Sequence, residues 1–259
     1  MDKRPIGMFD SGVGGLSILE ETKKILPFEN FIFLADQAHV PYGAKSPKEL
    51  KILTASIANF LLKSDIKMLV VACNTASCYT IDFLRKKFSI PIVGVIPAIK
   101  PAVKITQKGK IAILSTPATA SSAYLKDLIG KIASNKEVLP LGCEGLEEAV
   151  ENLKFKDISK LLKKYVQIVK TFGADVIVLG CTHYPFLKKE IKILAGRNTK
   201  VIDSGPAIAA RIKSLLNSHQ MISKSKHTDL FFTTGNPKEF SKVASTLLKY
   251  KIYGRKVLI

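Results

Sequence analysis

Two stretches of the chain, Lys67–Ser77 (KMLVVACNTAS) and Asp175–Pro185 (DVIVLGCTHYP), share one pattern. Each is a short apolar run that ends in a cysteine followed by small polar residues. Apolar runs without alternation are typical of central parallel strands that helices cover on both faces. The polar residues then lie at the carboxyl end of a strand, where open α/β sheets bind ligands. The pattern predicts two similar half-domains, each with a thiol at a strand end.

The same alternation of short β-branched runs and longer amphipathic segments continues along the chain. Expected strands are Pro5–Asp10, Asn30–Ala35, Lys67–Cys73, Pro91–Val95, Lys110–Ser115, Glu137–Leu141, Asp175–Gly180, Lys200–Asp203 and Asp229–Thr234. Expected helices are Gly15–Leu26, Pro47–Lys63, Ala76–Phe88, Ala118–Ile129, Ile158–Phe172 and Phe186–Ala195. This order predicts an α/β fold with two pseudosymmetric, Rossmann-like half-domains, mainly parallel sheets flanked by helices, and an active site in the cleft between them.

Composition restricts the class of protein. The 259 residues carry 40 Lys+Arg and 21 Asp+Glu, a net charge of +19, and 47% are hydrophobic, so the chain can bury a real core. Only five of the cations are Arg, and the Lys residues are dispersed as pairs, which makes a nucleic-acid partner unlikely. No apolar run reaches the roughly 18 residues of a membrane helix, and no signal peptide is recognisable. We therefore expect a cytoplasmic protein with free thiols and no membrane association.

Two loops after the first strands could contact a ligand. Asp10–Leu16 (DSGVGGL) has three glycines before a helix start, which favours an anion site, although a generic glycine-rich turn is equally consistent. The spacing fits neither a Walker loop nor GxGxxG. In Pro41-Tyr42-Gly43, the Tyr42 side chain and the Gly43 amide could touch a ligand, and His39 is expected to be a partly exposed loop residue.

The two strand-end cysteines are the strongest candidates for chemistry. Cys73 precedes a helix start, where the dipole lowers a thiol pKa, and Cys181 is followed by Thr182 and His183. Cys78 is expected to pack, and Cys143 lies in an irregular stretch; the absence of CxxC disfavours zinc, so we expect no metal. Two buried small residues remain the alternative interpretation of Cys73 and Cys181.

Two thiols in matching contexts suit inversion at a carbon acid. Removing a proton from one face and returning it to the other requires two acid/base groups on opposite sides, and a thiolate and a thiol exchange roles after each turnover. Donors after each cysteine, namely Asn74-Thr75 and Thr182-His183, could hold a carboxylate.

Five motifs in order, FDSGVGGL, ADQAHVPYG, VVACNTAS, IPIVGVIPA and VLGCTHYPFL, resemble the glutamate racemase family of the aspartate/glutamate racemase superfamily, from about residue 5 to about residue 207. CNTAS with GCTHYP marks the superfamily, and DSGxGG with PYG marks the glutamate branch. The resemblance implies a cofactor-independent isomerase that interconverts L- and D-glutamate and supplies D-glutamate for peptidoglycan, and so for cell wall biogenesis and cell shape. The alternatives are an aspartate or other amino-acid racemase, or a racemase with an additional nucleic-acid-binding role.

The resemblance also implies roles for individual residues. The cysteine matching Cys73 abstracts the α-proton of D-glutamate, and the one matching Cys181 abstracts that of L-glutamate. Asp10 and His183 assist the thiols, and Glu151, with Glu147 and Glu148 as rivals, matches an assisting carboxylate. Substrate contacts are implied for Asp10, Ser11, Tyr42, Gly43, Asn74, Thr75, Thr116, Thr119, Thr182 and His183.

By the same analogy, residues 1–96 and 206–259 form a discontinuous first domain and residues 97–205 a second. The C-terminal region, Ile208–Ile259, carries no recognisable chemistry and is expected to pack onto the first domain. The resemblance further suggests a homodimer. The family usually has Arg where this chain has His39.

Overall fold

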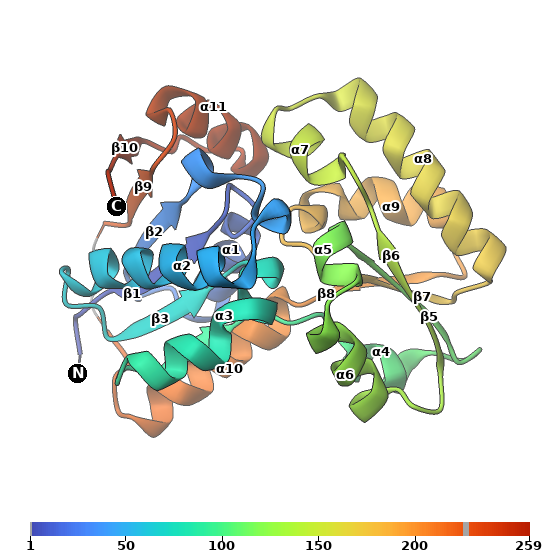
Figure 1. Cartoon of the computed structure of the whole chain (residues 1–259), viewed down its shortest axis with the longest axis horizontal. Helices are drawn as coiled ribbons and strands as arrows, with labels where there is room; N and C mark the ends of the chain where they lie inside the picture. The colour runs from blue at the N-terminus through green and yellow to red at the C-terminus, as the bar shows by residue number, and fades with distance from the viewer. Residues whose placement is uncertain (1, 225–227) are drawn as a thin grey trace. The chain divides into compact units, whose positions relative to one another are not determined.

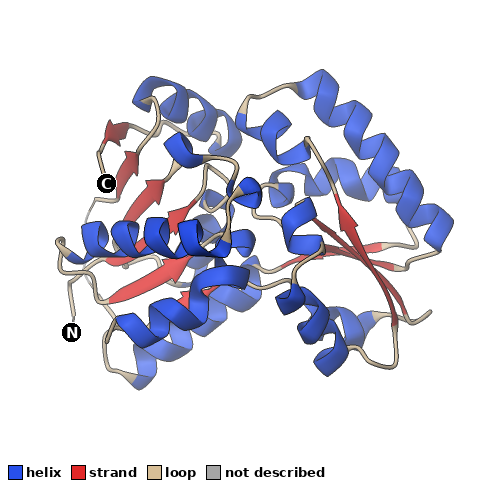
Figure 2. Ribbon diagram, in the orientation of Figure 1, coloured by secondary structure: helices blue, strands red, loops and turns tan. Residues whose placement is uncertain are grey.

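The computed structural model describes residues 2–224 and 228–259. The chain divides into two compact units: Met1–Val95 together with Gly205–Ile259 form unit 1, and Ile96–Ser204 form unit 2. Each unit contains a sheet of parallel strands flanked by helices, so the predicted α/β class is confirmed (Figures 1 and 2). Among the residues described, no helix is long and apolar enough to cross a membrane.

Unit 1 is built on a six-stranded sheet in the order β10-β9-β2-β1-β3-β4. Its strands are β1 (Ile6–Asp10), β2 (Phe31–Ala35), β3 (Met68–Val71), β4 (Ile92–Gly94), β9 (Leu230–Thr233) and β10 (Gly254–Lys256). Every residue of β1, β2 and β3 is buried, which is why these strands read as unbroken apolar runs.

The helices of unit 1 are α1 (Leu16–Ile25), α2 (Pro47–Leu62), α3 (Asn74–Lys87), α10 (Gly205–Ser218) and α11 (Pro237–Leu248), with short 3-10 turns η1 (Gln37–His39) and η2 (Tyr42–Ala44). Helices α2 and α3 pack together over one core that includes Phe9, Leu34 and Val71. Helix α1 packs against α10. The C-terminal segment contributes Phe240 of α11, which stacks on Phe33 of β2 at 6.5 Å between ring centroids.

Unit 2 is built on a four-stranded sheet in the order β6-β5-β7-β8. The strands are β5 (Lys110–Ser115), β6 (Glu137–Gly142), β7 (Val176–Leu179) and β8 (Lys200–Asp203). Its helices are α4 (Ile99–Ile105), α5 (Pro117–Ala120), α6 (Ala123–Ile132), α7 (Leu146–Glu151), α8 (Phe155–Phe172) and α9 (Lys188–Ala195), with a 3-10 turn η3 (Tyr184–Leu187). Helices α4 and α6 share a core with Ile111, Ile113 and Val178, and α8 packs against α9.

Three predicted helices were wrong in detail. The expected helix Ala118–Ile129 is two helices, because Ser122 ends one turn and caps the next by accepting a hydrogen bond from the Leu125 amide at 3.1 Å. The expected helix Phe186–Ala195 is preceded by the 3-10 turn η3, which starts at Tyr184. Helix α3 starts two residues earlier than predicted, directly after Cys73. This early start places the thiol at the helix cap.

Candidate active site at the carboxyl ends of the strands

Both sheets have a topological switch point, where neighbouring strands are reached by connections in opposite directions. In unit 1, β1 pairs with β2 on one side and β3 on the other. In unit 2, β5 pairs with β6 and β7 in the same way. Ligands of open α/β sheets bind at the carboxyl ends of strands beside such a point. The candidate residues Asp10, Ser11 and Cys73 follow β1 and β3, and Thr116 and Cys181 follow β5 and β7.

Cys73 is the N-cap of α3 and is 5% exposed. Its Sγ accepts a hydrogen bond from the Ala76 amide at 3.5 Å and lies 3.7 Å from the Ser11 hydroxyl. A thiol at this position faces the free amides and the positive dipole end of a 14-residue helix. These amides are placed to donate hydrogen bonds to the sulfur.

Asp10 occupies the anion position that the glycine-rich loop was expected to offer. Its buried carboxylate accepts hydrogen bonds from the Ser11 amide at 2.8 Å and the Gly15 amide at 2.5 Å. A Cβ at Gly15 would lie 2.8 Å from the Cβ of Asp10 and 2.9 Å from that of Ala72, so the glycine permits this close approach. The loop amides thus fix a carboxylate of the chain itself beside Cys73's strand end.

Asn74 and Thr75 form the first turn of α3 and are both buried. The Oδ1 atom of Asn74 is buried and has no hydrogen-bond partner within the described part of the chain. A buried acceptor without a donor is costly, so such an atom indicates a partner that comes from outside the protein. Asn74 Oδ1 is suited to accept from an ammonium group.

Tyr42 and Gly43 lie in the short turn η2 of unit 1. The Tyr42 phenol is buried and donates to Asp36 at 2.7 Å, so its proton is directed into the protein. Gly43 is exposed in this turn. Burial, together with the negative charge of Asp36, holds the pKa of Tyr42 well above its usual value, so the phenol stays protonated. His39 is partly exposed, as expected, and lies 2.7 Å from Asp36.

In unit 2, a thiol, an imidazole and a carboxylate form a chain of contacts. Cys181 Sγ lies 3.5 Å from His183 Nδ1, and His183 Nε2 lies 2.5 Å from Glu151 Oε1. Cys181 is 4% exposed and His183 is 1% exposed. Of the rivals to Glu151, Glu148 contacts Lys154 at 3.2 Å on the surface. Glu151, at the end of α7, is the carboxylate that contacts His183.

Burial shifts the pKa values of the Cys181 thiol and the His183 imidazole in opposite directions. Burial raises the pKa of the Cys181 thiol, and the hydrogen bond with His183 opposes that rise. Burial by itself would lower the pKa of His183, but Cys181 and the Glu151 carboxylate outweigh it and raise the pKa well above its usual value. Both net shifts are upward, so they favour the thiol at Cys181 and the imidazolium at His183.

The remaining candidates in unit 2 lie at the same strand ends. Thr116 caps α5 and its hydroxyl donates to the Thr119 hydroxyl at 3.1 Å. Thr119 and Thr182 are buried. Cys143 is also buried, and burial raises its thiol pKa. The half-buried Cys78 lies on α3, away from its first turn. Within residues 2–224 and 228–259 no group of three His, Cys, Asp or Glu side chains is placed to hold a metal ion.

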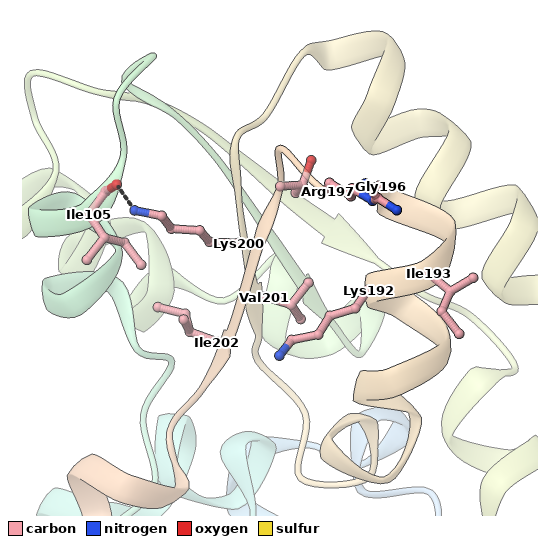
Figure 3. A pocket seen from close by; sticks show the side chains of 9 residues that line it. Ile105, Lys192, Ile193, Gly196, Arg197, Lys200, Val201 and Ile202 are labelled. Atoms are coloured by element: carbon pink, nitrogen blue, oxygen red, sulfur yellow. Dashed lines mark hydrogen bonds between the residues drawn. The ribbon is translucent and has the colours of Figure 1, made fainter.

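A surface cavity of about 710 Å³ lies elsewhere in unit 2, along the free edge of β8. Figure 3 shows Lys192, Arg197 and Lys200 around aliphatic side chains of this edge. It contains none of the predicted site residues and lies at the amino end of β8, away from the strand ends that carry the thiols. Lysines at a free edge strand are a common protection against edge-to-edge pairing.

Each unit thus places one buried cysteine at the carboxyl end of a strand, and comparison with known families shows the class of protein to which this arrangement belongs. A model of the Asp/Glu/hydantoin racemase family matches residues 16–212. The chain therefore belongs to this family.

Among individual proteins, the chain is similar to glutamate racemases. It is 40% identical to the glutamate racemase of Roseiflexus sp. over 250 residues, which cover 94% of this chain and 92% of that protein. A glutamate racemase isoform from Bacillus anthracis has a TM-score of 0.92 at 32% identity, covering 100% of this chain and 99% of that one. A Francisella tularensis glutamate racemase, solved with D-glutamate, has a TM-score of 0.85 at 29% identity, covering 100% and 98%. The resemblance seen in the sequence motifs is confirmed.

Proposed function

We propose that this chain interconverts L- and D-glutamate without a cofactor, with Cys73 and Cys181 as its two acid/base groups. The observation that carries the proposal is the pair of strand-end thiols, each with its own polar partners: Ser11 and the α3 amides for Cys73, and the His183–Glu151 pair for Cys181. The proposal requires that both thiols reach the same α-carbon from opposite faces. The product D-glutamate would supply peptidoglycan synthesis.

In the D-to-L direction, the Cys73 thiolate takes the α-proton and becomes a thiol. The electron pair stays on the α-carbon, and the Cys181 thiol donates its proton to the opposite face and becomes a thiolate. The reverse reaction exchanges these roles. A group that must be acid and base in turn needs two protonation states of similar free energy. Burial raises the pKa of Cys181 and so favours the thiol, and the hydrogen bond with His183 opposes that rise and brings the thiolate closer in free energy.

The substrate's polar groups match the donors and acceptors at the two strand ends. Asn74 Oδ1 would accept a hydrogen bond from the α-ammonium, which stays protonated and stabilises the carbanion. Amides and hydroxyls would bind the carboxylates, and the residues proposed for this are Ser11, Gly43, Thr75, Thr116, Thr119 and Thr182. Asp10 assists Cys73, and His183 with Glu151 assists Cys181. We further propose a cytoplasmic location, where thiols stay reduced, and assembly as a homodimer.

The test is circular dichroism of D-glutamate incubated with the purified protein, with no cofactor added. We expect the optical activity to decay to zero, and L-aspartate to react far more slowly. Cys73→Ala and Cys181→Ala should each lower racemisation at least a hundredfold, the low end of the effect of a general acid/base. Cys78→Ala is the matched control and should keep wild-type activity. Full activity in either strand-end variant would refute the two-thiol mechanism, and faster turnover of aspartate would refute the substrate.

A further inference from the structure

The C-terminal segment of unit 1 makes a polar contact that no local sequence pattern predicts. Thr234 directly follows β9 and is 4% exposed. Its hydroxyl donates to Asp36 Oδ1 at 2.7 Å and accepts from the Ala38 amide at 3.0 Å. The same Asp36 oxygen contacts His39 Nδ1 at 2.7 Å. One threonine thus connects the end of β9 to Asp36, which precedes the turn η1, and to Ala38 in the middle of that turn.

Asp36 is the centre of these contacts. It is fully buried, and its second oxygen, Oδ2, accepts from the Tyr42 hydroxyl at 2.7 Å. Its amide donates to the Asp10 carbonyl at 2.9 Å, which fixes it beside the strand that carries Asp10. A buried carboxylate is stable only when several donors surround it. The side chains of Thr234, His39 and Tyr42 supply these donors, and their hydrogen bonds to Asp36 hold them in place.

These contacts connect Thr234 to the candidate active site. Thr234 fixes Asp36, Asp36 fixes the Tyr42 phenol, and Tyr42 begins the turn whose next residue offers the Gly43 amide. Tyr42 also lies close enough to Cys73 and Asp10 for both charges to act on its phenol. The segment from Gln37 to Ala44 consists of two short 3-10 turns, and its other supports are the burial of Tyr42 in the core of unit 1 and the hydrogen bond from the Thr233 hydroxyl to Gln37 at 2.9 Å.

We infer that Thr234 and Asp36 are positioning residues for the glutamate-binding turn around Tyr42 and Gly43. This inference rests on the proposed function. It assigns the C-terminal segment a role in the site. Thr234, at the carboxyl end of β9, supplies a hydroxyl that holds the turn in place without touching substrate. Loss of the hydroxyl should loosen the turn and weaken substrate binding, while the proton transfers at Cys73 and Cys181 continue once substrate is bound.

The experiment compares Thr234→Val with Thr234→Ser and with a matched control, Thr246→Val. Thr246 lies on α11 in the same segment, is exposed, and bonds only the Lys242 carbonyl of its own helix among the contacts seen. Thr234→Val should raise KM for glutamate about fivefold or more with kcat changed less than twofold, the pattern of lost binding rather than lost chemistry. Thr234→Ser, which keeps the hydroxyl, should restore KM.

A second readout does not depend on activity. Hydrogen exchange of the amides in residues 37–44, the Ala38 amide above all, should speed up about tenfold in Thr234→Val. Tyr42→Phe removes the contact with Asp36 from the other side and should raise KM in the same way, so the inference stays testable if Thr234→Val folds poorly. If Thr234→Val changes KM and exchange no more than Thr246→Val does, the inference is wrong. A wild-type protein that does not racemise glutamate would refute the proposed function, whereas the exchange result would still decide the role of Thr234.

Discussion

At the scale of single residues, the contact between His183 and Glu151 controls which protonation states the Cys181 thiol can reach. A protonated imidazole beside the thiol stabilises its thiolate, and the carboxylate beyond it stabilises the protonated imidazole. The His183 pKa lies well above its usual value because Cys181 and Glu151 outweigh burial, whose own effect is to lower it. We therefore expect the pH range of activity to extend to the alkaline side.

Glu151→Gln should narrow that range. Glutamine keeps an oxygen near His183 Nε2 but removes the charge, so the His183 pKa falls and the imidazolium is lost at lower pH. We expect kcat/KM near pH 6 to fall little, and its alkaline decline to begin about one pH unit earlier, which is the usual effect of one nearby charge. The measurement is a pH profile in each direction of reaction.

The matched control for this profile is Glu148→Gln, whose carboxylate faces Lys154 at the surface. The raised pKa of His183 also makes the stability of the protein depend on pH. The stabilisation is fully present below the pKa of an unfolded histidine, and it is lost as the pH rises through the pKa of His183 in the folded protein. A Glu151→Gln profile that is lower but unchanged in shape would contradict this role for the carboxylate.

At the scale of elements, the turn between α4 and β5 depends on one carboxylate. Asp175 accepts hydrogen bonds from the Thr106 hydroxyl at 2.6 Å and from the amides of Gln107 and Lys108 at 2.6 and 3.0 Å. Burial by itself would raise the Asp175 pKa, but these hydrogen bonds outweigh it and the pKa lies below its usual value. The turn thereby fixes the start of β5 beside that of β7.

Asp175→Asn should lower the free energy of unfolding by about 1–3 kcal/mol at pH 7, since the carboxylate accepts hydrogen bonds at both of its oxygens and asparagine has only one acceptor oxygen. Because the pKa of Asp175 is lowered by folding, its stabilisation of the protein is fully present above the pKa of the unfolded chain. It is lost as the pH falls through the pKa of the folded protein. The difference between variant and wild type should therefore shrink at pH 3. Urea unfolding at both pH values checks this, with the exposed Asp127→Asn on α6 as control. A difference of equal size at pH 3 would contradict it.

The elements that sequence patterns predicted are those whose burial is uniform or periodic. Strands β1, β2 and β3 are buried throughout and read directly as apolar runs. The three-residue edge strand β10 has two exposed residues and no apolar pattern, so it was not predicted. The candidate site shows the same division. Cys73 and Cys181 could be predicted as candidates because each follows an apolar strand. The hydrogen bond from Thr234 to Asp36 joins residues 198 positions apart, so no local sequence pattern indicates it.

At the scale of the whole molecule, the lysines that the structure describes are exposed or partly exposed, with Lys67 as the exception. Lys67 is completely buried, and its Nζ lies 2.6 Å from the buried Glu29 carboxylate. It also donates to the carbonyls of Asp2 and Met221 at 2.9 and 2.7 Å. Glu29 in turn accepts from the Ser223 amide at 2.8 Å. This ion pair connects three distant parts of unit 1 and holds the segment after α10 to the amino ends of β2 and β3.

Lys67→Met should destabilise unit 1 by about 3–5 kcal/mol, the usual effect of leaving one partner of a buried ion pair without the other. Adding Glu29→Gln should recover part of that loss, because a neutral side chain no longer buries an unpaired charge and its oxygen can still accept from Ser223. Urea unfolding measures both variants, and the exposed Lys63→Met is the control for loss of a lysine. Proteolysis near Met221 should be faster in the single variant than in the double. A double variant no more stable than Lys67→Met would show that the lost carbonyl contacts, and not the charge on Glu29, determine how firmly the C-terminal segment is held.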